Sequence, residues 1–256
     1  MDTTDTTTDT TTDTATDTTT DVTTEVTTDV TVTTDVTTPE STTSPRSETS
    51  PDPGTSPYLG TSPSREPLRL AVILGSNRQG RFGPVVSRWF VGRAAERTDF
   101  TTELVDLADT DLPTALSSRP GPAVRAELAK VTERLAAADA FVVVTPEYNH
   151  SFPASLKALI DWHYGEWQAK PVGFVSYGGI SGGLRAVEQL RQVFAELHAV
   201  TVRDTVSFHM AGAHFDDQGR HKDPAQADAA AKAMLDQLGW WGLALRDAKS
   251  VRPYGA

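Results

Sequence analysis

The stretch Leu68–Pro84, LRLAVILGSNRQGRFGP, decides the fold class of this chain. It opens with an apolar run of strand length that is interrupted only by Arg69 and bounded by Gly75, which is typical of a strand buried on both faces of a parallel sheet. Pro84 suits the first turn of a helix. Apolar residues then recur at helical spacing as far as Arg97, at Val85, Val86, Trp89 and Phe90. We therefore expect a buried strand, a loop over residues 75–83 and a helix.

The same alternation of strands and helices continues along the rest of the chain. Further strands are expected at about residues 101–107, 140–145, 172–177 and 200–206, and further helices at about 122–137, from Pro153, at 183–198 and at 225–245. Five strand–helix repeats in about 190 residues predict an α/β fold with an open, doubly wound, five-stranded parallel sheet and helices on both faces. Because ligands of such sheets bind beyond the carboxyl ends of the strands, the loops after the first, third and fourth strands are the candidate site.

Residues 1–66 differ in composition from all that follows. They contain 27 Thr, 13 acidic and 2 basic residues and so carry the whole formal net charge of -11, whereas the remaining 190 residues contain 21 basic and 21 acidic side chains. An acidic residue at every fourth position from Asp5 to Asp29 would stack like charges on one face of a helix, and seven prolines follow in residues 39–67. We predict a disordered Thr/Asp-rich tail and Pro/Ser linker over residues 1–66 and one folded domain over residues 67–256.

Composition also excludes several classes of function. Without cysteine the chain has no thiol nucleophile, no Cys-based redox centre and no iron–sulfur cluster. No metal site is expected, because His150 has no second ligand at a suitable spacing. The neutral domain and the acidic tail disfavour nucleic acid as a partner. The chain shows neither the pattern of a signal peptide nor an apolar stretch of membrane-spanning length, so we expect a cytoplasmic protein with no membrane partner.

The first loop, residues 75–83, has the chemistry of an anion-binding site. It is rich in small residues, precedes a helix N-terminus and offers Ser76, Arg78 and Arg81 to a phosphate. It lacks the glycine at residue 77 that the dinucleotide fingerprint needs, and the lysine and hydroxyl at residues 81 and 82 that the Walker pattern needs. A terminal monophosphate therefore fits the loop better than a triphosphate. The alternative is a glycine-rich turn whose arginines are merely solvated.

The loop after the third strand, residues 145–153, offers backbone N–H groups and an aromatic wall. The residues concerned are Pro146, Glu147, Tyr148 and Asn149. Glu147 is the one candidate general base, but no partner for it is visible within the loop, so a positioning role is the better interpretation.

The loop after the fourth strand, residues 177–183, contains four glycines, which allow close backbone approach to a ligand. Residues 179–183 also match G-x-S-x-G, the nucleophile elbow of α/β-hydrolases, with Ser181 as the nucleophile. Asp204 followed by His209 or His214 would complete a triad in the required chain order. Against this reading, no His-Gly-Gly oxyanion segment is present, and the other two loops stay unexplained.

Taken together, the three loops resemble the NADPH-dependent FMN reductase family of flavodoxin-like fold, which includes quinone, azo-dye and chromate reductases. The matching stretches are residues 75–81, 145–157, 160–162 and 170–179. Each stretch alone is weak, and their combination is specific. The resemblance does not extend to residues 1–66.

The resemblance implies a sheet order of 2-1-3-4-5 and a bound FMN in a domain spanning residues 67–256. It implies that the FMN phosphate is held by Ser76, Arg78 and Arg81, that the ring is lined by Pro146, Glu147, Tyr148 and Asn149, and that the other ring edge is closed by Tyr177, Gly178 and Gly179. Flavin N5 would take hydride from NADPH or NADH and later reduce a quinone, free flavin, azo compound or similar small molecule in a ping-pong mechanism, with no catalytic side chain.

The resemblance further implies a homo-oligomer, dimer or tetramer, with Trp162, Tyr164 and Trp167 as candidate interface residues, although aromatic residues after a helix more often pack in the core. Two other classes of function remain as alternatives. One is an electron-transfer carrier of flavodoxin type, which usually needs an acidic docking face that this neutral domain lacks. The other is the serine hydrolase using Ser181.

Overall fold

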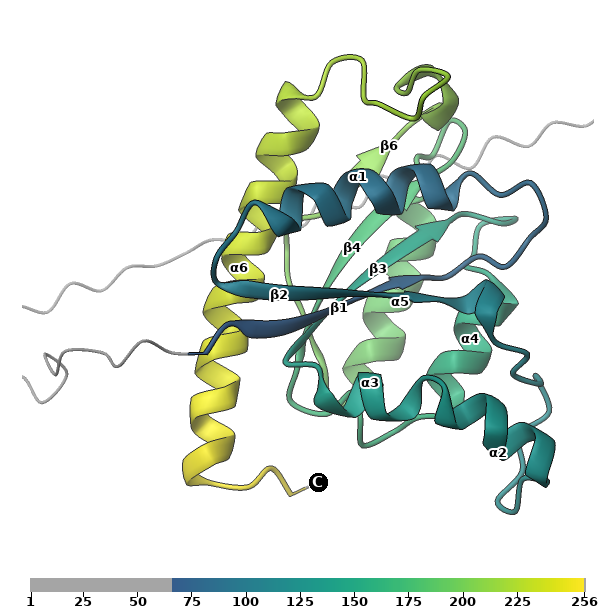
Figure 1. The fold of residues 1–256 in the computed structure, drawn as a ribbon, viewed down its shortest axis with the longest axis vertical. Coiled ribbons are helices and arrows are strands. Elements are labelled where there is room, and N and C mark those ends of the chain that lie inside the picture. Colours follow the sequence, from purple (N-terminus) through teal and green to yellow (C-terminus); the bar gives the residue numbers. More distant parts are fainter. Residues whose placement is uncertain (1–65, 256) are drawn as a thin grey trace, which may run out of the picture. The chain divides into compact units, whose positions relative to one another are not determined.

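The computed structural model describes residues 66–255, so the predicted disordered segment, except for Glu66, lies outside the described residues. Strands and helices alternate as expected (Figure 1). The strands are β1 (Leu68–Leu74), β2 (Phe100–Asp106), β3 (Ala140–Pro146), β4 (Pro171–Tyr177), β5 (Val200–Thr201) and β6 (Val206–Phe208). The helices are α1 (Gly83–Ala95), α2 (Pro122–Ala129), α3 (Thr132–Ala137), α4 (Ala154–Asp161), α5 (Leu184–Glu196) and α6 (Ala225–Val251), with short 3-10 turns η1 (Leu107–Asp109) and η2 (Ala211–Ala213).

The sheet is parallel throughout, with the order β2-β1-β3-β4-β5, and β6 also pairs with β4. This confirms the predicted order and the flavodoxin-like class. The order reverses at β1, which has β2 on one side and β3 on the other. The loops that leave β1 and β3 therefore start from neighbouring strands, as the sequence analysis requires.

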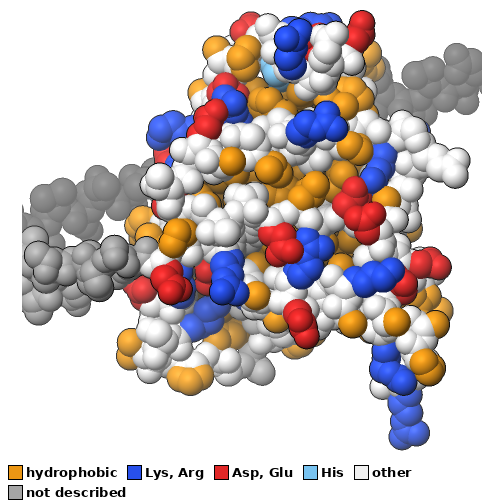
Figure 2. Space-filling model, viewed as in Figure 1, with side chains coloured by type: hydrophobic (Ala, Val, Ile, Leu, Met, Phe, Trp, Pro, Cys, Tyr) orange, Lys and Arg blue, Asp and Glu red, His pale blue; other side chains and the backbone are white. Residues whose placement is uncertain are grey.

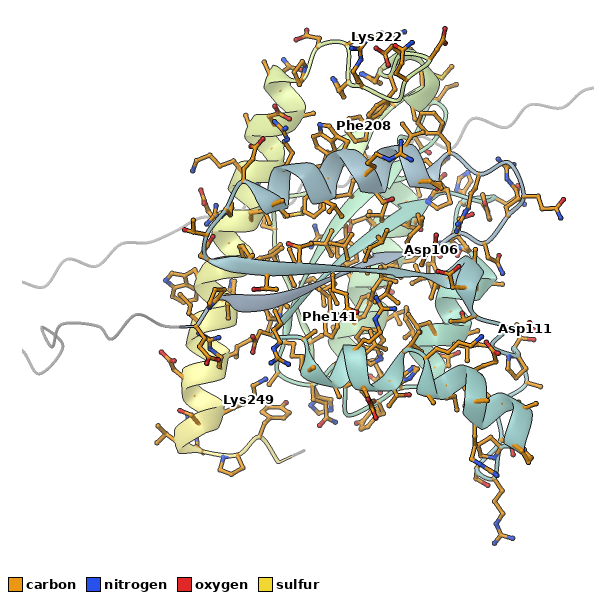
Figure 3. The ribbon with its side chains drawn as sticks, viewed as in Figure 1. Asp106, Asp111, Phe141, Phe208, Lys222 and Lys249 are labelled. Atoms are coloured by element: carbon orange, nitrogen blue, oxygen red, sulfur yellow. The ribbon has the colours of Figure 1, made fainter. Side chains whose placement is uncertain are left out.

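Alternate residues of the central strands enter two separate hydrophobic layers. Leu70, Val72 and Leu74 pack with residues of α1 and α6, whereas Ala71 and Ile73 pack with residues of α3, α4 and α5. Figure 1 shows α1 above the sheet and α3 and α4 below it. In Figure 3, Phe208 lies on the side of the first layer and Phe141 on the side of the second. Both faces of the sheet are covered by helices, which explains why the sequence of β1 is almost continuously apolar.

The fifth strand is interrupted, which the sequence did not indicate. β5 pairs with the start of β4 and β6 with its end, while residues 203–205 leave the ladder. Side chains of neighbouring helices bind the backbone there. Arg191 donates to the carbonyls of Val202 and Arg203, and Gln237 accepts from the backbone N–H of Asp204.

The single helix expected at residues 122–137 is two helices, α2 and α3. Val131 at the junction is buried, with φ of -123° and ψ of -31°. The hydroxyl of Thr132 donates to the carbonyl of Leu128, which competes with continued helical bonding at this point. Helix α6 continues past the predicted end at residue 245 to Val251. Among residues 66–255, no helix has both the length and the apolar character needed to cross a membrane.

Candidate functional site

The three predicted loops leave neighbouring strands at one edge of the sheet. Leu74, the last residue of β1, is in register with Val144 of β3, and Pro146 at the end of β3 is in register with Tyr177 at the end of β4. Parallel strands place their carboxyl ends at the same edge, so the loops form a continuous surface. All ten sequence-predicted site residues belong to these loops or to the strand ends from which they start.

The start of the first loop is fixed by its neighbours. Gly75 donates its backbone N–H to Val144 at 2.9 Å and accepts a hydrogen bond from the Ser155 hydroxyl at 2.6 Å. The buried hydroxyl of Ser76 bonds the phenol of Tyr148 at 2.6 Å. Ser76 and Tyr148 thus join the first loop to the second, although 72 residues separate them in sequence.

The middle of the first loop, residues 77–80, is exposed. Arg81 donates its backbone N–H to Arg78, closing a turn in which Gly80 has φ of +64°. A positive φ at this position of a turn favours glycine, and a Cβ on Gly80 would meet nothing within 4 Å. The turn leaves its outer backbone accessible to an anion in front of α1, whose N-terminus has no side-chain cap.

The two arginines of the loop have different environments. The Arg78 guanidinium lies 5.9 Å from the centre of the Tyr148 ring, and within the described chain no carboxylate pairs with it. Arg81 instead forms two hydrogen bonds of 2.6 Å to the two carboxylate oxygens of Asp106. This interaction holds the pKa of Arg81 above its ordinary value. Of the two, only Arg78 presents a positive charge that a carboxylate of residues 66–255 does not neutralise.

The second loop contains a tight backbone turn. Tyr148 and Ser151 exchange backbone hydrogen bonds of 2.8 and 3.0 Å, and the two residues between them, Asn149 and His150, have φ of 50° and 70°. Two successive positive φ values are the signature of a type I′ turn. The turn presents Asn149 and His150 to solvent beside the partly buried ring of Tyr148.

Glu147 is tied to the first turn of α5. Its carboxylate accepts from the Arg185 side chain at 2.6 Å and from the Arg185 backbone N–H at 3.2 Å. Burial works to raise the pKa of Glu147, but the Ser181 hydroxyl and Arg185 outweigh it and lower the pKa below its ordinary range. An ionised, ion-paired carboxylate is a poor proton acceptor, so the geometry supports a positioning role for Glu147.

The third loop brings glycines and a buried phenol to the same edge. Gly179 is exposed and Gly178 is partly exposed, and a Cβ on Gly179 would meet nothing within 4 Å. The Tyr177 hydroxyl is buried and has no hydrogen-bond partner in the part of the chain that the structure describes. The hydroxyl lies against Gly83, the first residue of α1, so closely that a Cβ added to Gly83 would be 2.7 Å from it. Burial raises the pKa of Tyr177, so its hydroxyl stays a proton donor.

The hydrolase reading is not supported by the geometry. The Ser181 hydroxyl accepts a long bond of 3.5 Å from the backbone N–H of Gly183 and interacts with the Glu147 carboxylate, and neither partner is a histidine. His209 bonds the carbonyl of Ile180, and His214 bonds the carbonyl of His209. Asp204 pairs with Arg203 and Gln237. No Ser–His–Asp relay is therefore assembled among the described residues.

A cavity of about 690 Å³ lies at the other end of α1, against α6, and is a poor alternative site. Its ionic side chains pair with one another. Arg93 pairs with Glu96 and Asp228, and Arg97 pairs with Asp99. These pairs neutralise most of the charge that lines the cavity, although Nε of Arg93 and Oδ1 of Asp228 have no hydrogen-bond partner within residues 66–255.

Several residues that shape the site were not found from the sequence. They are Asp106, Ser155, Arg185 and Gln189. Each lies outside the loop that it supports, so its role depends on the packing of separate elements. Of the candidate interface residues, Trp167 is fully buried in the core, as the alternative interpretation held, whereas Tyr164 is exposed.

The residues at this edge fit a flat ligand that carries an anionic group. The exposed turn and the free Arg78 charge suit the anion, while Tyr148 and the exposed glycines allow a planar ring to approach. The Tyr177 hydroxyl, which has no hydrogen-bond partner within residues 66–255, is a further donor next to the first loop.

Comparison with known proteins agrees with this chemistry. The family model described as NADPH-dependent FMN reductase matches residues 68–213. An NAD(P)H-dependent FMN reductase of Schizosaccharomyces pombe is 39% identical over 132 residues, which cover 49% of this chain and 64% of that protein. A quinone reductase of Escherichia coli is 33% identical over 142 residues, covering 54% of this chain and 74% of that protein.

Solved structures show the same fold. The flavoenzyme FerB, an NAD(P)H:(acceptor) oxidoreductase from Paracoccus denitrificans, superposes with a TM-score of 0.54 and 22% identity, covering 68% of this chain and 97% of that chain.

Proposed function

This chain belongs to the NADPH-dependent FMN reductase family, and from that premise we propose that residues 67–256 form an oxidoreductase domain that binds FMN and uses it to pass electrons from NAD(P)H to a small molecule. The family confirms the sequence prediction of FMN as the flavin and of NAD(P)H as the reductant. The observation that carries the proposal is the contrast between the two loop arginines, since no carboxylate of residues 66–255 pairs with Arg78 beside its exposed turn.

We assign the FMN phosphate to the first loop. Arg78 would supply the charge and the exposed backbone of residues 77–80 the hydrogen bonds. The Ser76 hydroxyl already bonds the Tyr148 phenol, so part of the role of Ser76 would be to position Tyr148 beside the flavin. The ring would lie against Pro146, Glu147, Tyr148 and Asn149 on one side and Tyr177, Gly178 and Gly179 on the other, as the sequence resemblance implies.

When bound, FMN would supply the hydride acceptor. The protein would position the flavin and hold the side chains around it in a fixed ionisation state and conformation. Glu147 stays ionised through Arg185 and holds the second loop on α5. Gln189 supports the same loop by donating to the carbonyl of His150 at 2.8 Å and accepting from the Ser151 hydroxyl at 2.7 Å. These contacts fix Tyr148 and Asn149 relative to the first loop. The flavin ring would therefore be held in the same position for NAD(P)H and for the electron acceptor.

Several finer features are part of the proposal. The acceptor would be a quinone, a free flavin, an azo compound or a similar small molecule, used in turn with NAD(P)H in a ping-pong cycle. The protein would associate with further copies of itself and act in the cytoplasm. The carrier alternative receives no support from Figure 2, where acidic and basic side chains are interspersed on the face shown and do not form one acidic field.

The test is the affinity for FMN of Arg78→Ala, compared with the affinity for riboflavin, which lacks the phosphate. We expect FMN to bind about 10- to 100-fold more weakly, the usual effect of losing a charged hydrogen bond, while riboflavin binding is unchanged. Arg119→Ala is the matched control, because Arg119 is exposed and its side chain forms no hydrogen bond or ion pair within residues 66–255. Equal FMN affinity in wild type and Arg78→Ala would refute the phosphate assignment.

A further inference from the structure

Asp106, the last residue of β2, lies beside the first loop and binds it through Arg81. The two side chains form a bidentate pair with both bonds at 2.6 Å, and they are only 15% and 19% exposed. Figure 3 shows Asp106 at the end of β2, near the segment that joins β1 to α1. Arg–carboxylate pairs with two parallel bonds fix orientation as well as charge.

Arg81 uses the same guanidinium to close the loop on itself. Its Nη1 donates to the backbone carbonyl of Ser76, five residues earlier. Side-chain bonds therefore hold the loop at Ser76 and at Arg81, and the exposed turn of residues 77–80 lies between these two points. Replacing the Arg81 side chain would remove its bonds to Ser76 and Asp106 and leave the turn less constrained.

Asp106 is itself held in place. Its Oδ1 accepts the backbone N–H of Ala108 at 3.0 Å and so caps the short turn η1. Its backbone is in register with Leu74, the residue before the first loop. Leu107 follows it and is buried in the core. The carboxylate is thus a rigid support that the β1–β2 pairing brings to the loop.

We propose that Asp106 is a positioning residue for the flavin phosphate: it holds Arg81 as a brace of the first loop, and the preference for a phosphorylated flavin depends on that brace. The inference rests on the proposed FMN function, and it reassigns Arg81, which the sequence analysis placed on the phosphate. Arg78 and the turn backbone bind the anion, and Arg81 keeps the turn in shape.

Simple electrostatics predicts the opposite effect of removing Asp106. A carboxylate near an anion site repels the anion, so neutralising it would strengthen FMN binding, and a released Arg81 would add a cation. If Asp106 instead holds Arg81 in place, removing the carboxylate should weaken FMN binding. The sign of the change therefore separates the two accounts.

The experiment measures dissociation constants for FMN and riboflavin by quenching of flavin fluorescence in wild type, Asp106→Asn, Arg81→Gln and the double variant. Asn keeps the shape of the side chain and can still cap Ala108. We expect each single variant to bind FMN about tenfold or more weakly, as for loss of a charge-assisted pair, and riboflavin within about twofold of wild type. The double variant should be no weaker than either single variant, because both changes break one brace.

Asp109→Asn is the matched control, since it removes a nearby exposed acidic charge without touching the bonds of Arg81. It should bind FMN at least as well as wild type. Unchanged or tighter FMN binding by Asp106→Asn would overturn the brace. So would equal losses for FMN and riboflavin, which would indicate general unfolding. If wild type itself fails to bind FMN, the proposed function fails first, whatever the variants do.

Discussion

Lys170 is a cation held inside the fold, immediately before β4. It is 7% exposed, and its Nζ donates to the carbonyls of Leu135 and Ala136 at 2.8 and 2.9 Å, in the last turn of α3. Burial, together with the nearby charge of Lys249, lowers the pKa of Lys170 to about 8, although Asp139 and Glu166 act in the opposite direction. The residue therefore combines a favourable helix contact with a cost for its buried charge.

This cost predicts a specific dependence of stability on pH. The folded-state pKa of about 8 lies below the ordinary lysine pKa of 10.5, so between these values the unfolded chain binds more protons. The free energy of unfolding should then rise by about 1 to 3 kcal/mol as the pH increases from 8 to 10. Above pH 10 the buried Tyr177, whose pKa is raised, begins to act in the opposite direction.

Urea unfolding of Lys170→Met and of the control Lys222→Met, at pH 7.5 to 10, tests this at the residue scale. The rise should persist in Lys222→Met, whose side chain is exposed, and be much smaller in Lys170→Met, where Lys249, whose pKa is also lowered by burial, still contributes. The same rise in both variants would show that Lys170 does not titrate as described.

The sequence could identify the candidate site residues as a group but could not separate their roles. Residue types and loop positions identified Arg78 and Arg81 together, because both suit a phosphate. The structure separates them through Asp106, which is 25 residues from Arg81 in sequence. The Arg81–Asp106 ion pair follows from the β1–β2 register, and no local pattern in the sequence indicates it.

At the scale of the elements, the junction of β4 and α5 is the most constrained of the three loop regions. Gly183 precedes α5 with φ of 85°, and a Cβ there would lie 2.7 Å from Cβ of Ser176 and 3.0 Å from the backbone nitrogen of Tyr177. Both neighbours belong to the buried strand β4 and cannot move aside. Glycine is required here by conformation and by space.

We predict that Gly183→Ala lowers the free energy of unfolding by roughly 2 to 4 kcal/mol, from backbone strain and overpacking. Gly179→Ala is the matched variant in the same loop, and because its Cβ would enter open space, it should change stability by less than about 0.5 kcal/mol. Urea unfolding of both variants provides the measurement. Similar losses in the two variants would contradict the assignment of the strain to residue 183.

Elements with strong apolar patterns were predicted well, and those shaped by side-chain contacts were not. β1 has the expected bounds because its buried run is continuous. The interruption between β5 and β6 depends on Arg191 and Gln237, which reach the backbone from other helices. The break between α2 and α3 depends on a Thr132 hydroxyl that also bonds His163.

At the scale of the whole molecule, the acidic charge and the flavin chemistry belong to different parts of the sequence. The net charge of -11 lies within residues 1–66, and the family match covers residues 68–213. The division of the chain at residue 66 stays a prediction. Within residues 66–255 every group assigned to the flavin lies at one edge of one sheet, so we predict that binding and reduction of FMN are properties of that edge.

The most direct test of the central claim is an anaerobic absorbance titration of the full-length protein with FMN, followed by NADPH or NADH and then by a quinone. We predict stoichiometric FMN uptake, loss of the oxidised-flavin absorbance when the nicotinamide is added, and its recovery when the quinone is added. Failure to take up FMN, or bound FMN that neither nicotinamide reduces, would contradict the account.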